Sequence, residues 1–411
     1  MINKKIVLIT SGQPALNPRL VKEADALADA GYDVIVIYQY WNEWGTKLDN
    51  ALLSEKKWKA YLIGGSPFTK KFTYLKSKLS YKIAVFIARK IGIKRCIAAQ
   101  AIGRCAPMLT KKASSIAADI YIAHNLAALP AAVIASKKNK AKSGFDAEDF
   151  HRNEQFDSSK NFDVNLKTYI EDQYIPKLDY ISTSSPFISI AYKKLYPEHY
   201  PVTILNVFPK QYVVAKPMRH EKLKLLWFSQ TIGYNRGIEL IIKALGILNN
   251  PKIELHLLGY CRDEVKICFS KLANQNGFNN RNLFYYTPIS PDDIFSFASK
   301  FDIGLATEIG TPDNRNICLT NKIFTYIQSG LAVLASNTIA QKQLLEEYPN
   351  IGMIYQKNSP ESLAQALQMY LDDGTLLYNH QLQAYQSAHE TLNWEAESTK
   401  FLAVLKKTLE C

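Results

Sequence analysis

The sequence predicts an α/β protein built from two doubly wound parallel domains, and three observations support this prediction. The chain has 411 residues, enough for two or three domains. Its composition is that of a globular protein, with 47% hydrophobic and 21% charged residues. Short β-branched runs alternate with turns and helical periods, which is the pattern of parallel βαβ units. Together they exclude a single small module, a fibrous protein and a disordered one.

The first βαβ unit is the clearest of the series. Residues 6–9 form an apolar strand, and Asn17 then caps a helix that has Pro18 at its first position. Gly31 suits the left-handed end of that helix, and residues 34–37 form the next strand. Further strands of this half are predicted at residues 120–123, 144–147, 180–183 and 202–205.

A second series follows residues 207–222, which lack periodicity and which we interpret as a linker. Its strands are predicted at residues 223–228, 253–258, 283–286, 302–306, 333–335 and 353–354. Its helices are predicted at residues 237–248, from 263, after 290–291, at 319–328 and from 360. The organisation is therefore an N-terminal domain (1–206), the linker (207–222), a C-terminal domain (223–385) and a helical tail (386–411) that can return to the N-terminal domain.

The doubly wound pattern also predicts where a ligand binds. In open α/β sheets, ligands bind beyond the carboxyl ends of the strands, so two facing sheets place the site in the cleft between them. Neither first turn contains a complete G-x-G-x-x-G motif, so no tightly held dinucleotide cofactor is expected.

Cysteines and apolar runs indicate the compartment. The six cysteines form no C-x-x-C pair and have no histidine at metal-ligand spacing, so we expect neither zinc nor a disulfide framework, and a reducing cytoplasm fits. The first apolar run is short and precedes Gly12 and Pro14, which indicates a strand and not a signal peptide. No run reaches the ~18 apolar residues of a spanning helix.

The net charge of +13 comes from one segment. Residues 56–118 contain fifteen Lys and Arg and no Asp or Glu, whereas the rest of the chain has 35 basic and 37 acidic residues. Apolar side chains recur there at helical spacing, at Phe72, Leu75, Leu79, Ile83 and Phe86. A basic face flanks them, formed by Lys71, Lys78, Lys82 and Arg89. This pattern is typical of an interfacial helix attracted to anionic lipid.

Two alternatives remain open for this segment. One is an ordinary amphipathic helix packed on its domain with a solvated charged face. The other is a nucleic-acid patch with Phe72, Tyr74 and Tyr81 as stacking residues, but no nucleic-acid-binding motif accompanies it. We therefore expect an anionic membrane surface as a partner, and no nucleic acid.

Motifs along essentially the whole chain resemble those of a known family. They are Asn17-Pro18-Arg19 before an Ala- and Leu-rich helix, Ala123-His124-Asn125 after a strand, Asn235-Arg236-Gly237 in a turn, Glu308 with residues 321–326 and 330–333, and Asn393-Trp394-Glu395 before the last helix. With these motifs the chain resembles the family 4 glycosyltransferases, which have the GT-B fold of two Rossmann-like domains facing across a cleft.

The resemblance implies a retaining glycosyltransferase that moves a hexose-type sugar from a nucleoside diphosphate sugar to a hydroxyl of a lipid-linked bacterial surface glycan. The C-terminal domain would bind the donor and the N-terminal domain the acceptor. No Asp cluster has metal-ligand spacing, so we expect transfer without a metal, as the resemblance also implies. The protein would work in the cytoplasm, peripherally on the inner face of the plasma membrane.

Site residues follow from the resemblance and from the chemistry. A departing diphosphate is stabilised by basic side chains, backbone N–H groups and helix N-termini. For this role the matching positions are Gly233, Arg236, Asn321 and Lys322. The resemblance places Glu308 at the donor sugar and His124 near the reacting centre, and these two are the catalytic candidates. On the acceptor side the candidates are Gly12, Arg19 and Asn125.

The chain departs from the family pattern at two places. Thr325 stands where many relatives carry the Glu that contacts the donor nucleotide, so by position it is a candidate at the donor sugar or nucleotide. An insert at residues 310–318 separates Glu308 from the following helix. A basic residue common early in the diphosphate turn is also absent, which leaves Arg236 as the basic residue of that turn.

Structural alternatives stand beside these assignments. Arg236 and Glu308 can be solvated surface charges, Lys322 can lie along its helix, and His124 can be a core histidine. Arg19 can pair with Glu23 one helical turn away. Four acidic residues after a strand offer a general base, which an inverting enzyme would need; they are Asp146, Glu148, Asp149 and Glu154.

Two rival functions share the fold. A nucleotide-sugar epimerase has two such domains and would form product from the donor alone. A non-catalytic protein that binds a glycan or a partner at the membrane would explain Thr325 without any turnover.

Overall fold

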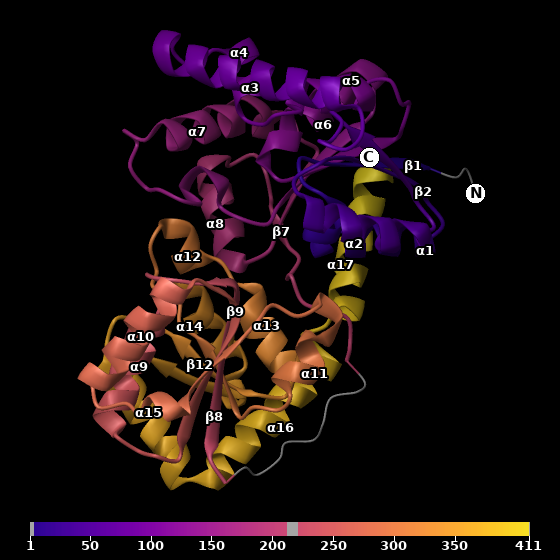
Figure 1. The fold of residues 1–411 in the computed structure, drawn as a ribbon. Helices are drawn as coiled ribbons and strands as arrows, with labels where there is room; N and C mark the ends of the chain where they lie inside the picture. Colours follow the sequence, from indigo (N-terminus) through magenta and orange to yellow (C-terminus); the bar gives the residue numbers. More distant parts are fainter. Residues whose placement is uncertain (1–3, 212–220, 411) are drawn as a thin grey trace. The chain divides into compact units, whose positions relative to one another are not determined.

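The computed structural model describes residues 4–211 and 221–410 and divides into two compact units (Figure 1). Unit 1 comprises Met1–Leu205, Pro312–Asn314 and Ser398–Cys411, and unit 2 comprises Asn206–Thr311 and Arg315–Glu397. Most of the predicted linker, residues 212–220, lies outside the described residues.

Unit 1 is built on a seven-stranded parallel sheet in the order β3-β2-β1-β4-β5-β6-β7. Its strands are β1 (Lys5–Thr10), β2 (Asp33–Gln39), β3 (Lys59–Ile63), β4 (Ile120–His124), β5 (Lys142–Ala147), β6 (Tyr180–Thr183) and β7 (Val202–Thr203). Its helices are α1 (Pro18–Asp29), α2 (Glu43–Ser54), α3 (Lys71–Ile91), α4 (Arg95–Ala101), α5 (Ala106–Ala113), α6 (Leu129–Asn139), α7 (Phe162–Tyr174) and α8 (Pro186–Leu195).

The first βαβ unit forms as the sequence predicts. The β1 side chains from Ile6 to Ile9 are fully buried, as expected for a strand covered on both faces of a parallel sheet. The Asn17 side chain accepts a hydrogen bond of 3.1 Å from the Leu20 N–H, so it caps α1 directly before Pro18. Gly31 has a φ of 88°, which the left-handed turn after the helix requires.

Unit 2 is built on a six-stranded parallel sheet in the order β10-β9-β8-β11-β12-β13. Its strands are β8 (Leu223–Ile232), β9 (Ile253–Cys261), β10 (Leu283–Tyr286), β11 (Ile303–Ala306), β12 (Ala332–Ser336) and β13 (Gly352–Tyr355). Its helices are α9 (Ile238–Leu248), α10 (Asp263–Gln275), α11 (Ile294–Ala298), α12 (Asp313–Ile317), α13 (Asn321–Gln328), α14 (Ile339–Glu347), α15 (Pro360–Asp372) and α16 (Gly374–Glu390), although the first two residues of α12 belong to unit 1.

The core of unit 2 lies between this sheet and the helices beside it. Buried Leu and Ile side chains of β8, β9 and α9 pack with Phe269 of α10 and with Leu363 and Leu367 of α15. The last helix, α17 (Trp394–Glu410), begins in unit 2, and its residues from Ser398 belong to unit 1.

The structure confirms the α/β class, the two parallel sheets and each predicted strand, and it adds β3. β3 lies at the edge of its sheet and most of its side chains are exposed or half-buried. Its four apolar residues, 60–63, directly follow a segment with three lysines, and the strand was not recognised from the sequence. Among the described residues, no helix is long and apolar enough to cross a membrane.

Candidate functional site

The sheet order of unit 2 brings the predicted donor residues together. The chain continues from β8 to β9 on one side and returns later to β11 on the other, so the topological switch point lies between β8 and β11. Arg236 follows the carboxyl end of β8, and Glu308 follows the carboxyl end of β11. Ligands of doubly wound sheets bind at this place.

The turn after β8 is held tightly against the end of β11. Gly237 has a φ of 86°, and a Cβ there would lie 2.5 Å from the Thr307 carbonyl oxygen. The Thr307 hydroxyl donates to the Arg236 carbonyl at 3.3 Å, and the Arg236 guanidinium donates to the Ser229 hydroxyl at 2.8 Å. No side chain caps α9 at Gly237. The turn therefore fixes Arg236 beside a helix N-terminus that can accept an anion.

Glu308 and Lys322 form an ion pair at the same end of the sheet. The Lys322 Nζ lies 2.6 Å from the Glu308 Oε1 and 5.3 Å from the centroid of the Trp227 ring. Burial raises the pKa of Glu308, but the positive charges of Lys322, Arg315 and Arg236 outweigh burial, so the pKa is lowered. Glu308 is therefore an ionised hydrogen-bond acceptor at neutral pH.

Arg315 joins this group from the insert, and sequence reasoning missed it. Its guanidinium donates to the Asn235 carbonyl at 3.4 Å. The only signal in the sequence is one basic residue within the insert that follows Glu308. We name Arg236, Arg315, Lys322 and Glu308 the cationic cluster: three positive charges face one negative charge, so the cluster is suited to bind an anion.

The other predicted donor residues differ in their surroundings. A Cβ at Gly233 would meet no atom within 4 Å, so open space adjoins the backbone there. Asn321 is the exposed first residue of α13, and no side chain caps this helix at Thr320. Thr325 is buried, and its hydroxyl donates to the Asn321 carbonyl at 3.0 Å. The Thr325 side chain thus serves the backbone of its own helix.

At the switch point of unit 1, between β1 and β4, Asn125 links the two strand ends. Its side-chain oxygen accepts from the Ser11 N–H at 3.2 Å and from the Ser11 hydroxyl at 2.6 Å. Its amide donates to the Thr10 hydroxyl at 2.9 Å. Asn125 has a φ of 65° and a ψ of 156°, a backbone conformation that residues other than glycine rarely adopt. The half-buried Gly12 and Asn125 thus lie at the carboxyl ends of neighbouring strands.

Arg19 and His124 lie in the interior of unit 1, in a buried ionic cluster with Glu23 and Asp146. The Arg19 guanidinium donates to both Asp146 oxygens, at 2.6 and 2.7 Å, and to the Ile204 carbonyl at 2.7 Å. The His124 ring lies between two carboxylates, 3.4 Å from Asp146 and 3.3 Å from Glu23. Arg19 also lies 3.5 Å from Glu23, the alternative that the sequence left open.

The electrostatics of this cluster fix its protonation. Burial lowers the pKa of His124, but the Glu23 and Asp146 carboxylates outweigh burial and raise it to about 10. Burial raises the pKa of Asp146, but Arg19 and His124 hold it well below its usual range. His124 is therefore a buried imidazolium at neutral pH. Both side chains are fully buried in this cluster, and the contacts with the acceptor and the donor sugar that we expected of them stay predictions.

The donor atoms of Glu23, His124 and Asp146 lie within 4.8 Å of one another, a spacing that a metal ion would also use. Both Asp146 oxygens already bind the Arg19 guanidinium, however. A divalent cation would face that guanidinium at short range. The residues therefore fit an ion-pair network better than a metal site.

Among the other acidic residues after β5, Glu148 stands out. Burial and the nearby Asp146 charge raise the pKa of Glu148 to about 7. Glu154 lies 3.0 Å from Lys167 and 3.4 Å from His151; although burial raises its pKa, these two partners outweigh burial and lower it to about 2. Glu148 is therefore the residue to test as a general base.

Two tryptophans that sequence reasoning missed follow the carboxyl end of β2. Trp41 is 67% exposed and Trp44 is 52% exposed. The Gln13 side-chain oxygen accepts from the N–H groups of Trp41 and Asn42, at 2.9 and 2.8 Å, and so joins this loop to the loop after β1. Exposed aromatic rings offer flat apolar surfaces, and the sequence signal is the pair of Trp residues directly after a strand.

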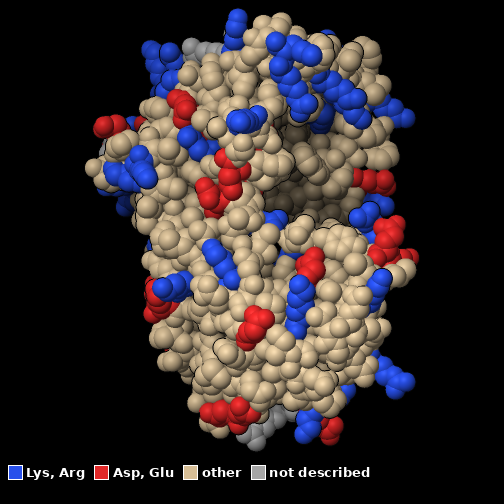
Figure 2. Space-filling model, turned by 90° about the vertical axis from the view of Figure 1, so that its left-hand side faces the viewer, with Lys and Arg blue, Asp and Glu red and all other residues tan. Residues whose placement is uncertain are grey.

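The predicted basic face lies on α3, where Lys71, Lys78, Lys82 and Arg89 are exposed. Figure 2 shows Lys and Arg side chains grouped on unit 1, with few acidic side chains among them in that view.

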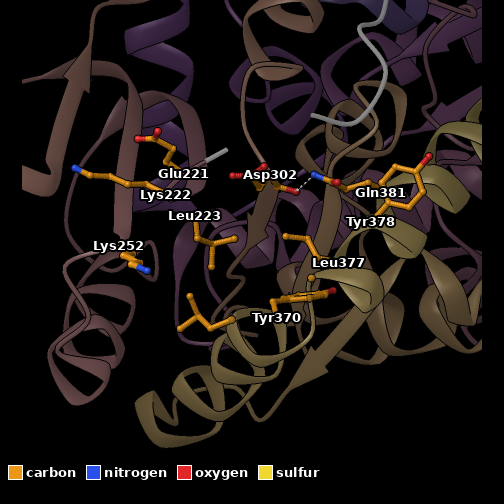
Figure 3. A pocket seen from close by; sticks show the side chains of 11 residues that line it. Glu221, Lys222, Leu223, Lys252, Asp302, Tyr370, Leu377, Tyr378 and Gln381 are labelled. Carbon is orange, nitrogen blue, oxygen red and sulfur yellow. Dashed lines mark hydrogen bonds between the residues drawn. The ribbon is translucent and has the colours of Figure 1, made fainter. Parts of the chain in front are cut away.

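A pocket of about 250 Å³ lies at the amino ends of the unit 2 strands, whereas the cationic cluster lies at their carboxyl ends (Figure 3). Leu223 begins β8, while Lys252 and Asp302 directly precede β9 and β11, and all three line the pocket. Gln381 of α16 closes one side and donates to the Asp302 carbonyl at 3.1 Å. The pocket is thus at the amino ends of the strands, away from the cationic cluster.

Comparison with known proteins supports the fold. No protein-family model and no curated protein sequence matches the chain. Several solved structures do match. HepE from Anabaena, in complex with UDP, matches at 13% identity and a TM-score of 0.69, over 98% of this chain and 100% of that one. A glycosyltransferase from Rickettsia africae matches at 15% identity and a TM-score of 0.68 over 99% of both chains. TarM from S. aureus, in complex with UDP, matches at 12% identity and a TM-score of 0.68 over 98% of this chain and 99% of that one. The two parallel α/β units of this chain therefore form the GT-B fold found in these glycosyltransferases.

Proposed function

We propose that this protein is a glycosyltransferase that moves a sugar from a nucleoside diphosphate sugar to a hydroxyl of a glycan acceptor, with retention of configuration. The observation that carries the proposal is the cationic cluster at the switch point of unit 2. A diphosphate is the anion that three basic side chains beside two helix N-termini suit best. The similarity to structures that contain UDP supports this choice.

Each residue of the cluster has a role in the proposed reaction. Arg236, Arg315 and Lys322 stabilise the negative charge that grows on the departing diphosphate. Glu308 stays ionised because its pKa is lowered, and its carboxylate accepts hydrogen bonds from hydroxyls of the donor sugar. Since the protein itself supplies three positive charges, we propose that the transfer needs no metal ion.

The hydrogen bonds and the pKa values of the acidic residues in unit 1 fit a transfer with retention of configuration. An inverting transfer needs a general base at the acceptor hydroxyl. Asp146 is buried and bound to Arg19 through both oxygens, so it is unsuited to that role. Glu148, with a pKa of about 7, is the competing candidate, and its substitution separates the two mechanisms.

For the acceptor, we propose the loops at the carboxyl ends of β1, β2 and β4. Gly12 and Asn125 lie at the switch point, where Asn125 holds the loop after β1 through its hydrogen bonds with Ser11 and Thr10. The exposed indoles of Trp41 and Trp44 provide faces on which sugar rings can stack. A glycan on a lipid carrier is the acceptor class we propose.

Methanolysis of UDP-glucose tests the reaction without knowledge of the acceptor; HepE, one of the similar structures, was also solved with this donor. In buffer with methanol and EDTA, the bond from the anomeric carbon to the diphosphate breaks and a bond to the methanol oxygen forms, while the methanol proton is lost to the medium. We expect UDP and methyl α-glucoside, detected by proton NMR, in wild type and in Glu148→Gln alike.

Other products would contradict the proposal. Methyl β-glucoside, lost in Glu148→Gln, would establish inversion with Glu148 as the base. An epimerised sugar formed without methanol would favour the epimerase. If a UDP, GDP or ADP sugar binds but none reacts, the protein is a non-catalytic binder.

A further inference from the structure

The apolar side chains of α3 point away from unit 1. Phe72 is 80% exposed, Leu79 61% and Phe86 63%, and Leu75 and Ile83 between them are also exposed. At about 100° per residue, these five side chains fall within an arc of about 80° on the helix. Phe68 before the helix and Ile91 at its end are exposed as well. The result is an apolar stripe along the whole of a 21-residue helix.

The opposite face of α3 attaches the helix to its unit. Its buried residues are small, Ser77, Ala84 and Ala88, and they lie about 160° from the middle of the stripe by the same helical periodicity. The Arg104 guanidinium donates to the Ser77 hydroxyl at 2.7 Å and lies 4.9 Å from the centroid of the Tyr74 ring. The alternative in which the apolar stripe packs on the domain is therefore wrong.

Basic side chains border the stripe, and no acidic side chain among the described residues pairs with them. The basic residues of α3 are Lys71, Lys76, Lys78, Lys82, Arg89 and Lys90, and all are exposed. In the described part of the chain, the ion pairs of residues 56–118 are those of Lys56 and Lys57, so none involves α3. Arg89 lies over the Phe162 ring at 4.9 Å and Lys78 lies 6.0 Å from the centroid of the Tyr74 ring.

The exposed apolar stripe and the basic residues beside it favour a lipid bilayer over another protein as the binding partner of α3. A helix lying in a bilayer interface buries its apolar face among acyl chains, while lysines at its sides reach the phosphates. Anionic headgroups supply the negative charge that segment 56–118 lacks. A second copy of this chain would bring equal positive charge to the contact and would be repelled.

We propose that α3 docks unit 1 onto an anionic bilayer surface, with Phe72, Leu79 and Phe86 inserted below the headgroups and Lys78 and Lys82 at the phosphates. The role that we give to this docking rests on the proposed function, whereas the docking itself does not. Docking would hold the acceptor loops of unit 1 at the membrane that carries a lipid-linked glycan.

Vesicle co-sedimentation of the full chain, without nucleotide, tests the proposal. Wild type is expected to bind vesicles of phosphatidylglycerol and phosphatidylcholine, and to bind pure phosphatidylcholine vesicles at least about tenfold more weakly. The apolar triple variant Phe72→Ser/Leu79→Ser/Phe86→Ser and the charge variant Lys78→Glu/Lys82→Glu should each lose at least about tenfold in partition coefficient on the anionic vesicles.

Matched controls lie on other helices of unit 1. Ile190 of α8 is 57% exposed, and Lys137 and Lys138 of α6 are exposed. Ile190→Ser and Lys137→Glu/Lys138→Glu should bind as wild type does. All variants change exposed residues, so their melting temperatures should match that of wild type, which separates lost docking from misfolding.

Three results would overturn the docking proposal. The first is equal binding to anionic and neutral vesicles, and the second is wild-type binding by the α3 variants. The third is a wild-type dimer in sedimentation velocity that the apolar triple variant converts to monomer, with no vesicle binding. None of them bears on UDP binding by the protein in free solution, so failure of docking and failure of the proposed transferase remain distinguishable.

Discussion

Replacing Asp146 with Asn is expected to lower the free energy of unfolding by about 3–5 kcal/mol, because it leaves buried charges without their partner. Asp146 neutralises Arg19 through two hydrogen bonds and also faces His124, and all three side chains are fully buried. An Asn side chain offers one oxygen, and its NH₂ group would face an Arg19 N–H. Denaturant unfolding of the variant, followed by circular dichroism, measures the loss.

The control is Glu43→Gln, which removes an exposed ion pair with Lys47 and should cost less than about 1 kcal/mol. An Asp146→Asn protein as stable as wild type would contradict the assignment of this cluster as a structural element of unit 1.

The same variant should change the titration of His124. The folded pKa of about 10 lies above the ordinary value of about 6.5, so protonation of His124 stabilises the fold fully below about pH 6.5. That contribution is lost as the pH rises toward 10. Removing the Asp146 charge lowers the pKa, so the imidazole NMR signals of His124 should titrate at lower pH in Asp146→Asn than in wild type.

Replacing Lys322 with Met is expected to lower kcat by about 10²–10³, the usual loss when one preorganised group that stabilises transition-state charge is removed. Met keeps the apolar stem near the Trp227 ring but has no charge. It also leaves Glu308 without the ion pair that lowers its pKa. The assay is UDP release from UDP-glucose in the presence of methanol.

Lys342 of α14 provides the matched control. It forms an exposed ion pair with Glu346 at 3.6 Å, so Lys342→Met should keep the wild-type kcat. A Lys322→Met protein with wild-type kcat would remove Lys322 from the catalytic machinery, whereas a higher KM alone would show that it only binds the donor.

The sequence predicted the strands well because buried parallel strands are continuous apolar runs, as at residues 6–9. It also predicted where Arg236 and Glu308 lie, because both follow strands that neighbour each other in a doubly wound sheet. The pairing of Arg19 with Asp146, 127 positions apart, comes from the order of β1, β4 and β5 and from the side-chain packing beneath them. No local pattern encodes that contact.

The periodicity of α3 likewise predicted a helix with an apolar face but left open what covers that face. A stripe of Phe, Leu and Ile has the same spacing whether it packs on a core or on lipid. In the structure, the buried face of α3 contains Ser77, Ala84 and Ala88, so the apolar stripe does not pack on the core of unit 1. Arg315 was missed for a related reason: only the folded insert brings it near Glu308.

Donor binding tests the central claim most directly. A ligand that binds the native state raises the melting temperature, so the protein should be melted with UDP, GDP, ADP and CMP and their sugars, beside Arg236→Ala and the exposed control Arg262→Ala. The account predicts a shift with one nucleoside diphosphate, kept in Arg262→Ala and reduced in Arg236→Ala. No shift with any nucleotide, or an equal shift in Arg236→Ala, would contradict a donor site at the cationic cluster.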